Sequence, residues 1–194
     1  MRGDAPAGLS LIAALGPIAE LTTAVQVHTW YLRAMATSEL AGGDPASALG
    51  HAREAIGLEP AGANAPNSAW AGIQAACALR DADQVEAVLR ATSGLRGRWF
   101  EQVRRTGRAM AASQRSEDTA PALAGVLEAL DEWERMDLPL DHASATIAAM
   151  WVTAAPAVLS EHVDRARATL ERLGARGLLA RLDAALAAAE QQAG

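Results

Sequence analysis

Residues 40–60 contain the feature that most constrains the fold, a helix-stop signal followed at once by a helix-start signal. One apolar, helix-forming stretch ends at Gly42–Gly43, and a second begins at Asp44 and Pro45 and stops at Pro60. An aspartate can cap the unpaired N–H groups of a helix, and proline suits the first helical position because its missing N–H has no role there. The segment therefore predicts two antiparallel helices joined by a tight turn.

Similar signals divide the rest of the chain into helices. Apolar residues recur at three- and four-residue spacing between turns rich in glycine, proline and aspartate. A long helix is expected over residues 17–41, and Asp81 and Ser160 are expected to cap the starts of two later helices. Gly174 stands where a helix ends in a left-handed residue. About nine helices joined by short turns leave no room for a sheet.

The predicted fold is all-α, a right-handed α-solenoid of antiparallel helix hairpins. Helix pairs recur at roughly 35–45 residues, which is near the period of helical-hairpin arrays. No pair of this length covers its own apolar face, so neighbouring pairs must stack. We expect residues 1–194 to form a single domain of this kind, either alone or as a fragment of a longer chain, with a groove that suits peptides or other domains.

The charge of the chain argues against two classes of partner. The formal net charge is −6 at pH 7, and all 17 basic residues are arginine. An acidic chain is a poor match for nucleic acid or for an anionic membrane surface. The uncharged segments 61–79 and 142–160 draw most of their apolar content from alanine, so neither is expected to span a membrane. The single cysteine, Cys77, excludes a disulfide framework and indicates a cytoplasmic protein with a buried thiol.

No residue pattern indicates catalysis, a cofactor or a metal. The four histidines are His28, His51, His142 and His162. Their spacing places no two metal ligands convincingly on one helical face; the nearest approaches are His51 with Glu54, and Asp141 beside His142. Cys77 has no activating neighbour, and a Walker-type phosphate loop is excluded because the chain has no lysine. The chain is therefore not expected to be an enzyme, and no catalytic, cofactor-binding or metal-binding residue is predicted.

The strongest local signal is a basic, amphipathic helix over residues 98–113. The surrounding segment 96–115 carries six arginines against one glutamate, a local charge of +5. At about 100° per residue, five of these arginines fall within an arc of about 120°, and the apolar residues fall on the opposite side. The members of this arginine face are Arg98, Arg104, Arg105, Arg108 and Arg115.

Three interpretations of the arginine face compete. The arginines can form a solvated face that pairs with acidic neighbours such as Glu117, Asp118 or Glu128. They can instead form a docking site for an acidic peptide or domain, because guanidinium groups bind carboxylates through paired hydrogen bonds. Direct nucleic-acid binding is the least favoured, since the chain is acidic and the segment has no interleaved exposed aromatic residues.

The five tryptophans fall one per expected helix. They are Trp30, Trp70, Trp99, Trp133 and Trp151. Most are expected to lie in contacts between helices. Trp70 has small or polar neighbours between Asn67 and Gly72, and it is therefore predicted to be exposed and to anchor a partner.

Residues 29–60 resemble one tetratricopeptide repeat. The positions of that family's turn glycine, two small second-helix residues and terminal proline are occupied by Gly43, Ala48, Ala55 and Pro60. Three positions depart from the pattern, since Leu32 replaces the first-helix tryptophan, Ala36 a glycine, and Ala52 an aromatic residue. The resemblance implies a helical hairpin that stacks on its neighbours.

Residues 120–190 resemble the end of bacterial multidomain signalling regulators. Trp133, Pro139 and Ala143 are followed by the segment 168–176 and a leucine-rich helix. Those proteins place a nucleotide-binding switch ATPase before a tetratricopeptide-like array, with a LuxR-type DNA-binding domain or a class III cyclase domain elsewhere in the chain. The resemblance implies a fold and a setting, and no active site.

The predicted function is a non-enzymatic interaction or regulatory scaffold in a signalling or transcriptional regulator. It would bind a protein partner, or a neighbouring domain of its own chain, through a groove. The alternative is a small-molecule sensor with an apolar, alanine-lined pocket between helices near Trp70 or Trp151. A cavity with converging polar groups would favour the sensor, and an open groove lined by arginines would favour the scaffold.

Overall fold

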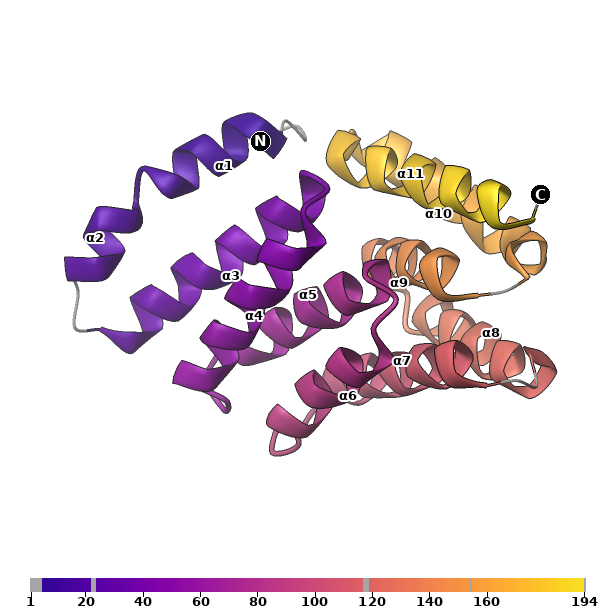
Figure 1. Cartoon of the computed structure of the whole chain (residues 1–194), viewed down its shortest axis with the longest axis horizontal. Helices are drawn as coiled ribbons and strands as arrows, with labels where there is room; N and C mark the ends of the chain where they lie inside the picture. The colour runs from indigo at the N-terminus through magenta and orange to yellow at the C-terminus, as the bar shows by residue number, and fades with distance from the viewer. Residues whose placement is uncertain (1–4, 22–23, 117–118, 154, 194) are drawn as a thin grey trace.

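Helices form all the regular structure of the described residues (Figure 1). The computed structural model describes residues 5–21, 24–116, 119–153 and 155–193, and no strand occurs in these ranges. None of the described helices is both long enough and apolar enough to cross a lipid bilayer. The predicted all-α class is confirmed. The elements are α1 (Ala5–Ala13), α2 (Gly16–Leu21), α3 (Val25–Ala41), α4 (Pro45–Leu58), α5 (Ala65–Ala78), α6 (Ala82–Ala91), α7 (Arg98–Arg115), α8 (Thr119–Arg135), α9 (Pro139–Val152), the 3-10 helix η1 (Pro156–Leu159), α10 (Ser160–Leu173) and α11 (Arg176–Ala193).

The long helix expected over residues 17–41 is divided in the structure, so that prediction is wrong. Helix α2 ends at Leu21, and α3 begins at Val25 after Ala24, which is extended with φ −81° and ψ 101°. The sequence has two threonines at 22–23, and β-branched residues have low helix propensity. Residues 22–23 themselves lie outside the described ranges.

Three predicted helix ends are confirmed. At the start of α4 the Asp44 carboxylate accepts a hydrogen bond from the N–H of Ser47 (3.1 Å). At the start of α6 the Asp81 carboxylate accepts one from the N–H of Gln84 (3.0 Å). Helix α10 ends at Leu173, and the next residue, Gly174, has the left-handed φ of +63° that glycine adopts without steric cost. Local capping chemistry therefore sets these boundaries.

The prediction that Ser160 caps α10 is wrong. Ser160 is itself helical, with φ −53° and ψ −44°, and Leu159 takes the position before the helix. The 3-10 helix η1 leads directly into α10, so the chain has no extended residue at which a serine side chain could cap.

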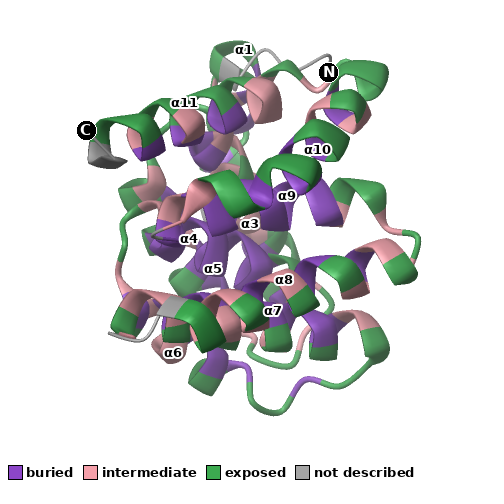
Figure 2. Cartoon of the chain, turned by 90° about the vertical axis from the view of Figure 1, so that its right-hand side faces the viewer, coloured by how far each residue is buried: buried purple, intermediate pink, exposed green. Residues whose placement is uncertain are grey.

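The packing of the helices places α5 and α9 at the centre of the molecule. From α3 to α11, each helix contacts the next, and each odd-numbered helix also contacts the following odd-numbered one. Two further contacts, of α5 with α9 and of α3 with α11, join helices that are distant in sequence. Most residues of α5 and α9 are buried as a result (Figure 2).

Trp133 of α8 lies in a cluster of three tryptophans. Its side chain is fully buried, and its ring centroid is 5.9 Å from that of Trp70 and 6.2 Å from that of Trp99. Its indole N–H donates a hydrogen bond to Thr106 Oγ1 (2.9 Å), which offsets the cost of burying that polar group. The cluster therefore joins α5, α7 and α8.

The prediction that Trp70 is an exposed anchor for a partner is wrong. Its side chain is only 6% exposed. The small neighbours that suggested exposure have the opposite effect, because Ala69, Ala71 and Gly72 let other helices approach α5 closely. Trp30 of α3 is exposed instead.

Cys77 of α5 is buried, as the sequence predicts. Its side chain has no exposed surface, and its Sγ lies 3.5 Å from Met110 Sδ. Burial raises the pKa of the thiol to about 12, so the reactive thiolate is nearly absent at neutral pH.

Candidate functional site

The arginine face lies on α7, whose apolar side turns toward the core. Phe100, Val103 and Met110 are buried on that side, as the helical periodicity predicts. On the opposite side Arg98, Arg105, Arg108 and Arg115 are exposed, and Arg104 is partly buried. The amphipathic helix predicted over 98–113 is therefore confirmed.

Three of the five predicted arginines pair with acidic residues of the same chain. The pairs are Arg104 with Glu101 (2.7 Å), Arg105 with Glu128, and Arg115 with Asp83 (2.5 Å). Arg104 also donates to the carbonyl of Leu95 (3.0 Å) and lies over the ring of Phe100. The predicted pairing with Glu128 is thus observed, whereas residues 117–118 lie outside the described ranges.

Arg98 and Arg108 are the members of this face that remain available. Both are exposed, and neither forms an ion pair with another described residue. Trp70 is buried in the core, so it does not join them in one surface.

A second polar group, absent from the sequence-based candidates, gathers where α8, α9 and α10 meet. Glu134 lies in the last turn of α8, His142 in the first turn of α9, and His162 in the first turn of α10. Both histidines are buried, and Glu134 is partly buried. We call these three residues the Glu–His–His cluster.

The turn after α8 positions Glu134. Asp137 adopts a left-handed φ of +55°, and its N–H donates to the carbonyl of Glu134 (2.9 Å). The N–H of Leu138 donates to the carbonyl of Trp133 (3.3 Å), which completes a Schellman ending. Because Trp133 is anchored in the core, the next residue, Glu134, reaches the side chains of α9 and α10.

Three atoms of the cluster that can bind a metal lie close together. His142 Nε2 is 3.0 Å from His162 Nδ1 and 3.3 Å from Glu134 Oε1. His162 Nδ1 is 3.5 Å from the same oxygen, and all three atoms lie within 4.8 Å of one another. A single ion can therefore contact one atom from each of three helices.

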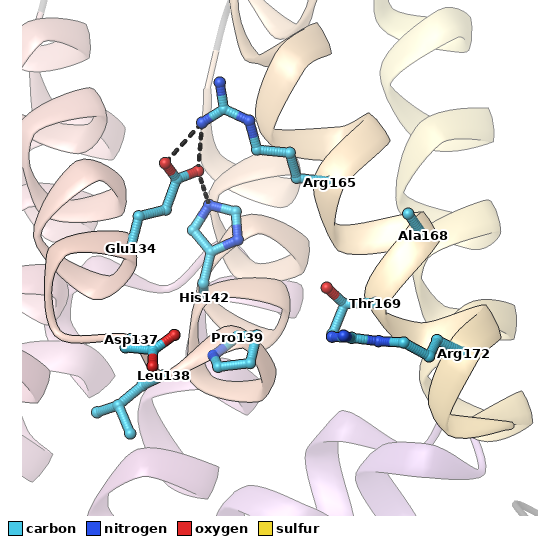
Figure 3. A pocket seen from close by; sticks show the side chains of 9 residues that line it. All are labelled: Glu134, Asp137, Leu138, Pro139, His142, Arg165, Ala168, Thr169 and Arg172. Atoms are coloured by element: carbon cyan, nitrogen blue, oxygen red, sulfur yellow. Dashed lines mark hydrogen bonds and ion pairs between the residues drawn. The ribbon is translucent and has the colours of Figure 1, made fainter.

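Arg165 of α10 holds the carboxylate of the cluster (Figure 3). Its Nη1 lies 2.5 Å and 2.6 Å from the two oxygens of Glu134, and its Nη2 lies 3.2 Å from Glu161 Oε2. Burial acts to raise the pKa of Glu134, but the hydrogen bond and positive charge of Arg165, together with the interactions with His142 and His162, outweigh it and lower the pKa. Glu134 is therefore ionised at neutral pH.

Burial keeps His142 neutral. It lowers the pKa of the imidazole to about 4, although the charge of Glu134 acts in the opposite direction. A neutral imidazole retains a lone pair that can accept a hydrogen bond or bind a metal, and an imidazolium does not.

A cleft of about 510 Å³ opens beside the cluster (Figure 3). Glu134 and His142 form part of its wall, and Arg165, Thr169 and Arg172 line it from α10. The other lining residues are Asp137, Leu138, Pro139 and Ala168. Polar groups of both charges therefore converge on a space of the size that small-molecule sites have.

The Glu–His–His cluster has the composition and spacing of a metal site. Two histidines and one carboxylate form a common ligand set for zinc and for non-haem iron. Tetrahedral bonds of about 2.0–2.1 Å place ligand atoms about 3.3 Å apart. The three observed separations are 3.0, 3.3 and 3.5 Å. Arg165 can remain hydrogen-bonded to the second carboxylate oxygen of Glu134 while the first oxygen binds the metal. Hydrogen bonds of this kind orient metal ligands.

The cluster was not predicted because its members lie on three different helices. Metal-ligand spacings within one helix cannot reveal it, since His142 and His162 are 20 residues apart. His51, considered with Glu54 from the sequence, lies 2.7 Å from Glu39 Oε2 instead. The only signal in the sequence is a histidine near the start of each of two successive helices.

Comparison with protein-family models, curated proteins and solved structures finds no match to the chain. The resemblance to tetratricopeptide repeats and to bacterial signalling regulators therefore stays a prediction. The geometry of the cluster and its cleft is the basis for a functional proposal.

Proposed function

We propose that the chain is a metal-responsive helical regulatory domain. Its Glu–His–His cluster binds a divalent transition-metal ion such as Zn²⁺, and the adjoining cleft leaves space for a water or a small ligand on that ion. The observation that carries this proposal is the convergence of Glu134 Oε1, His142 Nε2 and His162 Nδ1 within 4.8 Å.

The distribution of polar groups favours the sensor alternative over the scaffold. Converging polar groups line the cleft between α8, α9 and α10. The arginine face, in contrast, is largely paired within the chain. The proposed site is polar, and so differs from the apolar pocket expected near Trp70 or Trp151.

Metal binding at this position would link three helices. Without an ion, the same atoms already form polar contacts between α8, α9 and α10: the two imidazoles share a hydrogen bond, and both lie within 3.5 Å of Glu134 Oε1. An ion needs all three helices in their packed arrangement, so it stabilises that arrangement over looser ones. A ligand present at 100 times its dissociation constant adds about 2.7 kcal/mol of stability.

The helix order supports a hairpin array of the tetratricopeptide type. Contacts between successive helices, together with contacts between every second helix, are those that stacked hairpins make. The additional contacts of α5 with α9 and of α3 with α11 bring distant parts of the chain together. These long-range contacts make the helical array compact, which favours a regulatory domain with enclosed sites over an open scaffold for long peptides. The prediction that the chain is not an enzyme stays a prediction.

Titration of the chelator-treated protein with Zn²⁺, followed by calorimetry, tests the metal site. We expect one ion per chain and a loss of affinity of about 100-fold or more in His142→Ala and in His162→Ala, because each removes one ligand. Co²⁺ binding should produce the visible absorption of a low-symmetry nitrogen and oxygen site, and both variants should lose it.

His51→Ala is the matched control for these variants. His51 is a histidine that also contacts a glutamate, Glu39, outside the cluster. This variant should bind Zn²⁺ like the wild type, and circular dichroism should show that all variants are folded. Absence of binding by the wild type, or equal binding by the wild type and both cluster variants, would contradict the proposal.

The arginine face supports a second candidate function, the docking of an acidic protein segment. Arg98 and Arg108 are exposed on α7 and form no ion pair with other described residues. Guanidinium groups of this kind bind carboxylates through charge-assisted hydrogen bonds.

Charge reversal at Arg98 and Arg108 tests the docking function. The double variant Arg98→Glu/Arg108→Glu is expected to bind a fluorescent oligoglutamate peptide about tenfold more weakly at low salt, because attraction is replaced by repulsion. Fluorescence anisotropy measures the affinity. Arg53→Glu/Arg176→Glu makes the same charge change at exposed positions on other helices. Equal loss in the two double variants would show that net charge alone, and not this face, attracts the peptide.

A further inference from the structure

Arg181 of α11 is a buried charge without a counter-charge among the described residues. Its side chain is 9% exposed. Both Nη atoms donate to one acceptor, the side-chain oxygen of Gln74 on α5, at 3.3 Å each. Other arginines of the chain, such as Arg165 and Arg167, pair with carboxylates at the surface. Arg181 is therefore unusual both in its depth and in its neutral partner.

Burial of this kind is unfavourable unless something balances the charge. Moving an ion out of water into a protein interior costs several kcal/mol even after relaxation. Burial lowers the pKa of Arg181 to about 10, so the guanidinium still carries its charge at neutral pH. The amide of Gln74 satisfies hydrogen bonds but supplies no negative charge.

A cavity of about 160 Å³, partly open to solvent beside the exposed residues Gly43 and Ala184, adjoins Arg181. Its wall is otherwise formed by backbone and by uncharged side chains. These residues are Leu40, Gly43, Pro45, Ala78, Trp151 and Ala184. At about 30 Å³ for each water-sized group, the cavity has room for about five such groups. One charged end and a mostly apolar wall suit a ligand with an anionic head and a short hydrocarbon tail.

We propose that Arg181 anchors a binding site for a short-chain monocarboxylate. The carboxylate head would pair with the guanidinium, which offers two parallel N–H donors to an anion of that shape. The tail would lie against Trp151, Leu40 and the neighbouring small residues of the cavity.

The surroundings favour a single negative charge on the ligand. Leu40, Ala78 and Trp151 lie in the last turns of α3, α5 and α9. The C-terminal end of a helix carries a partial negative charge, which balances part of the guanidinium charge, so a ligand with one negative charge is enough to complete the balance. Phosphate and dicarboxylates also need more donors than one arginine in an apolar wall can offer.

This site is separate from the Glu–His–His cluster and does not depend on a metal. It joins α11 to the hairpin of α3 and α4, whereas the cluster joins α8, α9 and α10. A ligand at Arg181 would therefore stabilise the packing of α11 against α3, two helices that are distant in the sequence.

Thermal unfolding of the full chain in chloride-free buffer with EDTA tests the site. Sodium butyrate should raise Tm in a saturable way, and acetate should do so less because it has a shorter tail. Sodium chloride should have little effect because chloride has no hydrocarbon tail. Succinate should have little effect because it carries two negative charges, and butanol because it carries none. Calorimetry with butyrate then gives the affinity.

Two variants identify the site of binding. Arg181→Met removes the charge but keeps an apolar side chain of similar length, and it should weaken butyrate binding by about 30-fold or more. Ala184→Leu keeps the charge and fills part of the cavity, and it should also abolish the Tm shift. Arg176→Met, at an exposed arginine in the first turn of the same helix, is the control and should respond like the wild type.

These outcomes distinguish two cases. In one, Arg181 binds a monocarboxylate; in the other, the buried charge of Arg181 is balanced by the helix ends or by a halide ion. No saturable response to butyrate in the wild type, or an equal response to chloride, would overturn the proposal. An unchanged response in Ala184→Leu would also overturn it, even if Arg181→Met did not fold. His142→Ala should retain the butyrate response, so failure of the metal site leaves this test intact.

Discussion

Trp133→Ala is expected to lower the free energy of unfolding by about 3–5 kcal/mol. The indole is fully buried between Trp70 and Trp99, so its removal leaves a cavity where α5, α7 and α8 meet. The hydroxyl of Thr106 also loses the N–H that donates to it. Urea denaturation followed by far-UV circular dichroism measures the change.

Two further tryptophan variants separate the causes of this loss. Trp133→Phe keeps most of the apolar volume but removes the hydrogen bond to Thr106, and it should cost about 1–3 kcal/mol. Trp30→Ala removes a side chain that is 44% exposed, and it should cost less than about 1 kcal/mol. A loss in Trp133→Ala no larger than that in Trp30→Ala would contradict the central role of the cluster.

Gly72→Leu is expected to destabilise the protein by about 3 kcal/mol. Gly72 lies where α5 approaches α4 and α6. A Cβ atom at this position would lie 3.3 Å from Ala52 Cβ and 3.3 Å from Val88 Cγ2, so even the first added carbon is tightly enclosed. The larger side chain forces the three helices apart. Differential scanning calorimetry should show a lower Tm.

Gly50→Ala is the matched control for a glycine within a helix. A Cβ at Gly50 of α4 meets no atom within 4 Å, so the substitution adds helix propensity without a clash. It should raise stability by about 0.5–1 kcal/mol. If both glycine substitutions changed stability in the same direction, close helix packing at Gly72 would not be the cause.

Local signals predicted much of the secondary structure. Asp44, Asp81 and Gly174 act at helix ends because capping depends on atoms within one turn of the chain. The periodicity of α7 placed Phe100 inside and Arg108 outside, as observed. Ser160 shows the limit of such signals, because a 3-10 helix immediately before it removes the geometry that a cap requires.

The candidate site could not be predicted in the same way. Glu134, His142 and His162 belong to three helices, and nothing in their spacing along the chain shows that these helices converge. The burial of Trp70 and of Arg181 could not be predicted from the sequence either. Small residues around Trp70 and a charge at position 181 would each suggest the surface, but both side chains are buried by helices from other parts of the chain.

The sequence by itself determined which segments are helical, how several of them begin and end, and which face of α7 is basic. The tertiary structure decided which helix faces meet, and so it decided the burial of Trp70, the Glu–His–His cluster and the cavity at Arg181. The physical reason is the range of the interactions. Backbone hydrogen bonds and caps act within about four residues along the chain. A binding site instead needs side chains from separate helices, which only the packing of α5, α9 and their neighbours brings together.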